Sequence, residues 1–393
     1  MPPYGRHKTL LLLYLKQHIR NRHMDRIKKT IGIDAHSLKH LSGGIGFYLF
    51  YLLKELIPIR SDCMFILYTS SSDDFTSLED FPNLKIYSMP LMSLPDSLWV
   101  QTRLALALYR DRPDYFWAPA QMIPILIPKK TKTILTVHDF VYRLAPNTMS
   151  LFRKLLMKSM RGFFYKSANS IFCNSQGTAN KLKSFYEVDA ASVITPPLKE
   201  TIAHRDSLEC QGVMDKYGLN FKEFILVVGT IEPRKNLIQL IEFYETLLLG
   251  SERSNVIPLV VVGGGGWKNK TIRLSIDRIK KLYPDHFFPL GFIPDEEISY
   301  LYSAARQLLL FSIYEGYGMP LMEARVCGTP VACFNMEEMR EATENDGLFM
   351  EKEGFETDLK AIFYKGNPLP ALPKKHTYPT NQELAKKLSA FFD

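Results

Sequence analysis

The chain has 393 residues, 46% of them apolar and 23% charged, which is the composition of soluble globular proteins and excludes a mainly disordered chain. At about 100–200 residues per domain, the length predicts two or three domains and excludes a single small module. The formal net charge is +8, of which residues 1–30 carry +7. The rest of the chain is therefore nearly neutral and offers no broad basic surface for nucleic acid.

Residues 1–29 are a basic extension ahead of the first predicted strand. The longest apolar stretch in it, Leu10–Leu13, is far shorter than the roughly 20 residues of a membrane-spanning helix, and no small-residue cleavage site follows. We expect a basic helix that assists adhesion to an anionic membrane, with the protein in the cytoplasm at the inner face of that membrane. The alternative is an upstream translation start, because Met24 lies just before the first convincing strand.

From Thr30 onward, β-branched runs alternate with helical patterns. The predicted strands are 30–34, 64–70, 84–88, 114–119, 132–139, 170–175 and 192–197, then 223–230, 258–264, 287–292, 307–312 and 330–335; the helices of the first half are 46–57, 97–110, 148–167 and 177–186. Continuous apolar strands between helices predict parallel sheets covered on both faces. A break near 197–222 gives two doubly wound α/β domains, 30–200 and 221–375. A C-terminal helix within 376–393 could pack on either domain.

The sequence predicts no disulfide and no metal site. Five cysteines form an odd set without a C-x-x-C pair, and four of them lie in or beside apolar runs, so buried thiols in a reducing cytoplasm are expected. No D-x-D pair occurs, and no second His or Cys stands at ligand spacing from His138.

In open parallel sheets, ligands bind outside the carboxyl ends of the strands, so the residues that follow each strand are the candidates for chemistry. The turn with Gly43 and Gly44 opens a helix, where it either touches a phosphate or only makes the turn. His138 stands at a strand end as either a hydrogen-bonding group or an ordinary structural histidine. Arg234 and Lys235 begin a helix directly after a strand. Because cations there oppose the helix dipole, we expect an anionic partner such as pyrophosphate rather than a solvated helix start.

The most specific segment begins at Glu315. Glu323 follows eight positions later, and Pro320 suits the first turn of a helix, so we place Glu315 on the preceding loop and Glu323 in the first turn, both facing a ligand. Gly316 and Gly318 let backbone N–H groups approach that ligand. A plain surface loop would not require two glycines and a proline, so a binding site is favoured.

A run of four glycines, Gly263–Gly266, follows another strand. It does not complete the dinucleotide-binding pattern G-x-G-x-x-G, because residue 268 is lysine. We expect the run to let a ligand or the facing domain approach the backbone closely.

These residues resemble the E-x7-E segment of the retaining nucleotide-sugar glycosyltransferases of family 4. The resemblance covers nearly the whole chain after residue 30, in the family's order, through GIDAHSL, SGGIGFY, TVHDFVYRLAP, FCNSQGTANKL, VVGTIEPRKNL, LGFIPDEEI and EGYGMPLMEARVCGTPV. The TIEPRKN and GGIGFY forms look most like bacterial mannosyl- and rhamnosyltransferases of surface polysaccharide synthesis. The resemblance implies the GT-B fold, with two Rossmann-like domains facing a central cleft.

The resemblance also implies roles for site residues. Arg234 and Lys235 would bind the diphosphate of a sugar nucleotide held by the C-terminal domain, and Glu323 its ribose hydroxyls. Glu315 would contact hydroxyls of the transferred sugar, and His138 that sugar near its anomeric centre. The further donor-binding positions implied are Gly44, Thr230, Ile293, Gly316, Gly318, Met319 and Pro320. Some relatives have an arginine in place of Thr230, so the diphosphate clamp here depends more on the cation pair.

The implied activity is retaining, metal-independent transfer of a sugar to a glycan or lipid-linked acceptor, with GDP-mannose the favoured donor and no cofactor. Without a metal, cations must stabilise the charge that builds on the leaving diphosphate. No carboxylate in these motifs clearly offers itself as a covalent nucleophile, which favours attack on the same face. Two alternatives remain open: a non-catalytic nucleotide-sugar-binding GT-B subunit, and a GT-B epimerase or disaccharide synthase.

Overall fold

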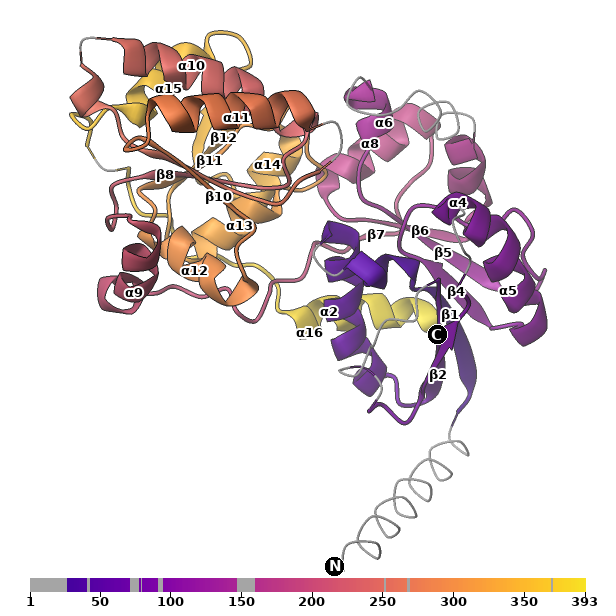
Figure 1. Cartoon of the computed structure of the whole chain (residues 1–393). Helices are drawn as coiled ribbons and strands as arrows, with labels where there is room; N and C mark the ends of the chain where they lie inside the picture. The colour runs from indigo at the N-terminus through magenta and orange to yellow at the C-terminus, as the bar shows by residue number, and fades with distance from the viewer. Residues whose placement is uncertain are drawn as a thin grey trace, which may run out of the picture.

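The computed structural model describes residues 27–40, 43–70, 78, 80–90, 95–146, 160–250, 252–266, 269–368 and 370–393. The predicted basic extension up to residue 26 and the first part of the helix predicted at 148–167 lie outside these residues. Two parallel sheets form two domains that lie side by side (Figure 1). The predicted fold class, two doubly wound α/β domains, is confirmed.

The first domain is built on a seven-stranded sheet in which all strand pairs are parallel. In sheet order its strands are β3 (Leu84–Ser88), β2 (Cys63–Thr69), β1 (Lys29–Asp34), β4 (Tyr115–Ala118), β5 (Lys132–Val137), β6 (Ser170–Cys173) and β7 (Ser192–Val193). Its helices are η1 (His36–His40), α2 (Gly44–Ile59), α4 (Asp96–Trp99), α5 (Ala105–Asp111), α6 (Val141–Leu144) and α8 (Gln176–Tyr186). A π-helical turn, Val100–Leu104, joins α4 to α5, so the helix predicted at 97–110 is interrupted there.

The second domain has a six-stranded parallel sheet. In sheet order its strands are β10 (Phe287–Gly291), β9 (Leu259–Val262), β8 (Ile225–Val228), β11 (Gln307–Leu310), β12 (Val331–Phe334) and β13 (Leu348–Met350). Its helices are α9 (Ser207–Tyr217), η4 (Pro233–Lys235), α10 (Leu237–Leu249), η5 (Arg253–Asn255), α11 (Lys270–Leu282), α12 (Asp295–Ala304), α13 (Met319–Val326), α14 (Glu337–Ala342) and α15 (Phe355–Phe363). The sequence did not predict β13, which has only three residues, two of them partly or well exposed.

The sheets form because their strands are apolar on both faces. All seven residues of β2 are buried, and they alternate between two cores: Phe65 and Leu67 join the cluster on one face, Ile66 and Tyr68 the cluster on the other. The second sheet is likewise flanked by two clusters. Burial on both faces is what covered parallel sheets require. All five cysteines are buried free thiols, as predicted.

The C-terminal helix α16 (Asn381–Ser389) and the short turn η6 (Ala390–Phe392) return to the first domain. Leu384, Leu388 and Phe392 are buried in the core that α2 covers, and α16 lies beside α2 (Figure 1). The sequence left open which domain this helix contacts, and the packing answers that question. None of the helices in the described residues is both long and apolar enough to cross a membrane.

Candidate active site

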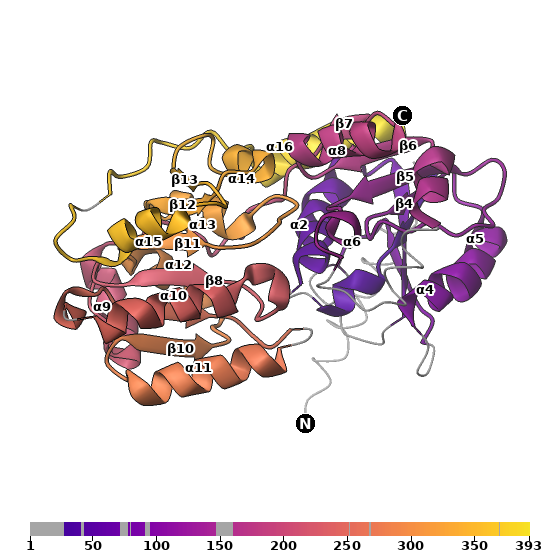
Figure 2. The same cartoon turned by 90° about the horizontal axis from the view of Figure 1, so that it is seen from above.

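A cavity of about 320 Å³ lies between the two domains, at the carboxyl ends of strands from both sheets. Seen from above, α2 lies on the side of the first domain that faces the second (Figure 2). Ten of the twelve predicted site residues line the cavity: Gly44, His138, Thr230, Arg234, Lys235, Glu315, Gly316, Gly318, Met319 and Pro320. The chain positions of these residues run from 44 to 320, so they meet because they follow strand ends rather than because of any local spacing.

The cation pair is compensated by carboxylates within the protein. Glu315 accepts hydrogen bonds from Arg234 Nη1 at 2.5 Å and from Lys235 Nζ at 2.6 Å, and Glu232 accepts from Arg234 Nη2 at 2.6 Å. Burial opposes ionisation of Glu315, but the two cations prevail and lower its pKa to about 2. Two carboxylates thus face two cations, and the formal charges of the cluster sum to zero.

The prediction that this pair begins a helix is wrong. Arg234 and Lys235 lie in the 3-10 helix η4, and α10 begins at Leu237, after Asn236 in the left-handed conformation with φ +57°. The argument from the helix dipole therefore fails, because the pair stands before α10 rather than on its first turn. The compensating anions are Glu315 and Glu232.

The two cations differ in the donors they retain. Arg234 donates four hydrogen bonds, to Glu232, Glu315 and the backbone carbonyl of Tyr314, which uses most of its five donors. In the described part of the chain, Lys235 Nζ donates one, to Glu315, although an ammonium group has three donors. Lys235 is therefore the cation with free capacity for an anionic ligand, and Arg234 holds the loop of Glu315.

His138 follows β5 and lies on the first-domain side of the cavity. It is 7% exposed; one ring nitrogen, Nε2, lies 2.7 Å from the carbonyl oxygen of Pro119, and the ring lies perpendicular to that of Tyr48, with 4.9 Å between the ring centroids. Burial lowers the pKa of His138 to about 4, although the Pro119 carbonyl opposes this shift. The ring is therefore neutral near pH 7 and acts as a hydrogen-bonding group rather than a cation.

The loop of Glu315 is held against the first domain. Ser175 Oγ, the N-cap of α8, donates to the carbonyl oxygen of Gly316 at 2.8 Å, and Thr178 Oγ1 donates to the same oxygen at 3.2 Å. A Cβ atom at Gly316 would lie 1.9 Å from the carbonyl oxygen of His138, so only glycine permits this approach. The E-x7-E loop is thus coupled directly to the strand end that carries His138.

Glu323 lies one turn further along α13 than predicted, outside the cavity lining. The helix begins at Met319, so Glu323 is its fifth residue and falls in the second turn. It is 7% exposed and accepts a hydrogen bond from Tyr302 Oη at 2.7 Å. Burial raises the pKa of Glu323, with Lys199 and the Tyr302 hydroxyl opposing the shift.

Two other predicted features also lie elsewhere. Ile293 is 5% exposed in the apolar core beside α12 and does not line the cavity. In the glycine run, Gly263 admits its own domain's backbone, since a Cβ there would lie 1.9 Å from the carbonyl oxygen of Gly229. Ile231 N–H also donates to the Gly264 carbonyl at 2.9 Å.

Seven residues of the lining were not predicted: Ile45, Tyr48, Asp139, Asn174, Pro196, Gly229 and Tyr317. The positions of two of them in the sequence could have indicated that they line the cavity. Tyr48 lies one helical turn after Gly44 and so shares its face of α2, and Asn174 follows β6 directly. In the described residues no three His, Cys, Asp or Glu side chains gather as metal ligands would.

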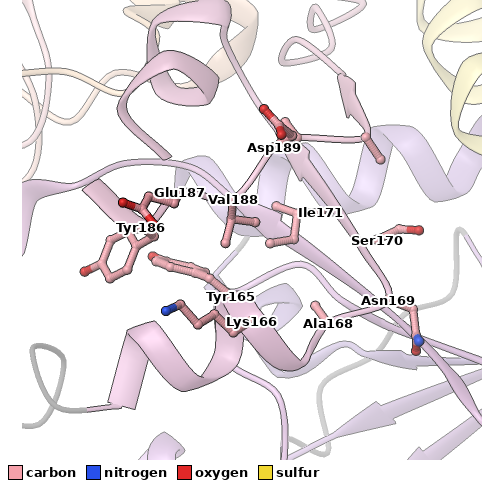
Figure 3. A pocket seen from close by; sticks show the side chains of 12 residues that line it. Tyr165, Lys166, Ala168, Asn169, Ser170, Ile171, Tyr186, Glu187, Val188 and Asp189 are labelled. Atoms are coloured by element: carbon pink, nitrogen blue, oxygen red, sulfur yellow. The ribbon is translucent and has the colours of Figure 1, made fainter. Parts of the chain in front are cut away.

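A second cavity, of about 480 Å³, lies in the first domain around Asn169, Tyr165 and Tyr186 (Figure 3). Three of its polar side chains are engaged within the fold: the Asn169 amide oxygen accepts from Thr133, Tyr186 is bonded to Tyr142, and Tyr165 to Arg161. We assign it no ligand.

Comparison with known proteins gives the class of this molecule. Residues 42–198 match the family model Glycosyltransferase Family 4, and residues 214–358 match Glycosyl transferases group 1. O-antigen chain mannosyltransferase B of Escherichia coli is 29% identical over 326 residues, which is 79% of this chain and 84% of that protein. The serotype-specific mannosyltransferase WbdA of Escherichia coli is also 29% identical, over 53% of this chain and only 26% of WbdA.

Solved structures share the architecture at low sequence identity. The sucrose-phosphate synthase of Thermosynechococcus elongatus superposes with a TM-score of 0.63 at 17% identity, over 85% of this chain and 90% of that one. WaaG, a glycosyltransferase involved in lipopolysaccharide biosynthesis, gives 0.62 at 15% identity, over 84% and 88%. With its two facing parallel-sheet domains and cleft, the chain is a glycosyltransferase of the GT-B type. The family 4 model matches its first domain and the group 1 model matches its second.

Proposed function

We propose that the chain is a retaining, metal-independent glycosyltransferase that moves mannose from GDP-mannose to a glycan or lipid-linked acceptor in cell-surface polysaccharide synthesis. The observation that carries the proposal is the cluster of Arg234, Lys235 and Glu315, which shares the interdomain cavity with His138. The choice of mannose is supported by the relatives, which are named O-antigen and serotype-specific mannosyltransferases.

The cluster suits departure of a nucleoside diphosphate. As the bond from the anomeric carbon to the diphosphate breaks, negative charge grows on the leaving oxygen, and a preorganised cation lowers the barrier most where that charge develops. Lys235 has free donors for this task. Glu315, ionised even in acid, is placed to accept hydrogen bonds from sugar hydroxyls in its remaining lone-pair directions.

His138 and the first domain are proposed to act at the anomeric carbon and on the acceptor. A neutral imidazole accepts or donates one hydrogen bond without adding a cation beside an anomeric carbon that is becoming positive. An acceptor hydroxyl that attacks from the face that the diphosphate leaves would give retention of configuration, and the leaving phosphate is then the nearest base for the hydroxyl proton.

A panel of sugar nucleotides tests the donor. A ligand that binds only the folded state, at a free concentration 100 times its Kd, adds about 2.7 kcal/mol to the free energy of unfolding. GDP-mannose should therefore give the largest increase in melting temperature, with or without EDTA. Loss of transfer in EDTA and its recovery with manganese would contradict metal independence. Product analysis without acceptor separates the alternatives, because an epimerase changes the donor alone and a binding subunit turns nothing over.

We also propose peripheral contact with an anionic membrane, where a lipid-linked acceptor would reside. An exposed face of the first domain, here named the α4–α5 face, supports it: Leu98, Leu106, Tyr109, Ile125 and Leu126 are 43–69% exposed. Gln101 Nε2 donates to the Ile123 carbonyl and Gln101 Oε1 accepts from the Ile125 N–H, which fixes the loop against the helix. Arg103, Lys129 and Lys130 are exposed close to these residues in the sequence. Apolar side chains beside cations match an anionic lipid surface, each cation adding about 1 kcal/mol.

Flotation with phosphatidylglycerol vesicles tests the contact. Leu106→Glu with Leu126→Glu, and separately deletion of residues 1–29, should each reduce binding. The control is Leu274→Glu, an equally exposed leucine on α11 of the second domain. Unchanged flotation in both test variants would remove the membrane role, and transfer to a soluble acceptor should persist in all of them.

A further inference from the structure

Asn174 is a buried polar residue at the edge of the interdomain cavity. It follows β6, and its backbone N–H donates to the carbonyl oxygen of Val137 on the neighbouring strand at 3.3 Å. Val137 and Cys173 are register partners, so His138 and Asn174 succeed them as neighbours at the carboxyl edge of the sheet. Asn174 is only 6% exposed, yet it lines the cavity.

The side-chain oxygen of Asn174 is unsatisfied. Oδ1 is buried and has no hydrogen-bond partner among the described residues, whereas buried polar atoms in folded proteins almost always have one. The position is also held firmly, because the next residue, Ser175, caps α8 and bonds the Gly316 carbonyl of the other domain. A fixed amide with an unpaired oxygen in a cavity is suited to pair with a ligand group rather than with a mobile part of the chain.

A sugar hydroxyl is the group that fits this amide. A hydroxyl donates one hydrogen bond and also accepts, so it satisfies both the oxygen and an N–H of the amide without any charge. A phosphate oxygen only accepts and would leave Oδ1 unpaired. We propose that Asn174 binds a hydroxyl of a sugar held in the interdomain cavity and helps to determine which sugar is used. The inference rests on the proposed function, and the hydroxyl belongs either to the transferred sugar or to the acceptor sugar.

Asn174→Ala tests the inference, with Asn169→Ala as the matched control. Asn169 stands at the opposite end of β6, where its Oδ1 accepts from Thr133 N–H at 2.7 Å, and it borders the second cavity instead (Figure 3). The measurements are the affinities for GDP-mannose and for GDP by titration calorimetry, and the KM for the acceptor. Asn174→Ala should weaken one sugar-dependent quantity by about 5- to 100-fold, the range for leaving one buried partner unpaired. Asn169→Ala should change thermal stability alone.

These measurements distinguish a hydroxyl of the transferred sugar from a hydroxyl of the acceptor sugar. Weaker GDP-mannose binding with unchanged GDP binding assigns the transferred sugar, and a higher acceptor KM with unchanged donor affinity assigns the acceptor. In either case a deoxy-sugar that lacks the hydroxyl should add no further loss in the variant. If Asn174→Ala does not fold, Asn174→Ser undergoes the same measurements. A folded variant with unchanged affinities and KM, or with fully additive losses, overturns this inference alone. A wild-type protein that binds no sugar nucleotide overturns the proposed function with it.

Discussion

Replacement of Glu315 by glutamine is expected to destabilise the protein while it strengthens the binding of a bare nucleoside diphosphate. Glu315 compensates both Arg234 and Lys235 at 2.5–2.6 Å, and the residue is 8% exposed. Its pKa of about 2, against an ordinary 4.5, corresponds to about 3 kcal/mol of interaction that the charged form makes and a neutral amide does not. At roughly 2–4 °C per kcal/mol for a domain of this size, the melting temperature should fall by about 6–12 °C at pH 7.

The pH dependence has a definite sign. A carboxylate whose pKa is lowered in the folded state stabilises above its unfolded value, and that contribution is lost as the pH falls from about 4.5 towards 2. The difference in melting temperature between wild type and Glu315→Gln should therefore be full at neutral pH and shrink in acid. A glutamine also leaves Lys235 uncompensated, so GDP should stabilise the variant more than the wild type.

The assay is thermal unfolding of both proteins with and without GDP, at pH 7 and in acid. Glu245→Gln is the control, because Glu245 forms a two-bond ion pair with the half-exposed Arg278 far from the cavity, and surface pairs contribute only about 0–1 kcal/mol. If Glu315→Gln melts at the wild-type temperature, or if GDP raises its melting temperature less than that of the wild type, Glu315 does not compensate the charges of Arg234 and Lys235.

Three further expectations follow from the same geometry. Lys235→Ala should lower kcat by roughly two to three orders of magnitude, about 3–4 kcal/mol, because the charge on the leaving diphosphate grows during reaction; steady-state kinetics that show only a raised donor KM would contradict this. Glu323→Gln should raise the donor KM about tenfold with kcat nearly unchanged, if the carboxylate binds ribose as the resemblance implies, and a loss confined to kcat would exclude that role. Burial lowers the pKa of His138 to about 4 from 6.5, so below pH 6.5 the unfolded chain binds a proton that the folded ring does not, and the free energy of unfolding should fall by up to about 3 kcal/mol as the pH falls towards 4. The difference in unfolding free energy between wild type and His138→Gln across that window checks this loss, and an NMR titration of His138 near pH 6.5 would count against it.

The strands were predictable because burial on both faces leaves an unbroken apolar run, as in β2 and β8. β13 was not, since Leu348–Met350 is short and its first residue is exposed. The carboxyl-edge rule located His138, Glu315 and the cation pair in one cavity without any contact information.

What the sequence could not show is how these groups interact. The ion pairs of Glu315 join residues 80 and 81 positions apart, which no local spacing encodes. The αL conformation of Asn236 moved the start of α10 beyond the cation pair, and only the backbone reveals that. The unpaired oxygen of Asn174 is likewise a property of packing, because asparagine after a strand is often satisfied by its own turn.

The most direct test of the central claim is a transfer reaction in excess EDTA, with GDP-mannose and a mannose-terminated acceptor, followed by NMR of the product's anomeric proton and carbon. We predict turnover without metal and an α-mannosidic linkage, the configuration that the donor carries. A β-linked product, or transfer that occurs only after manganese is restored, would contradict it.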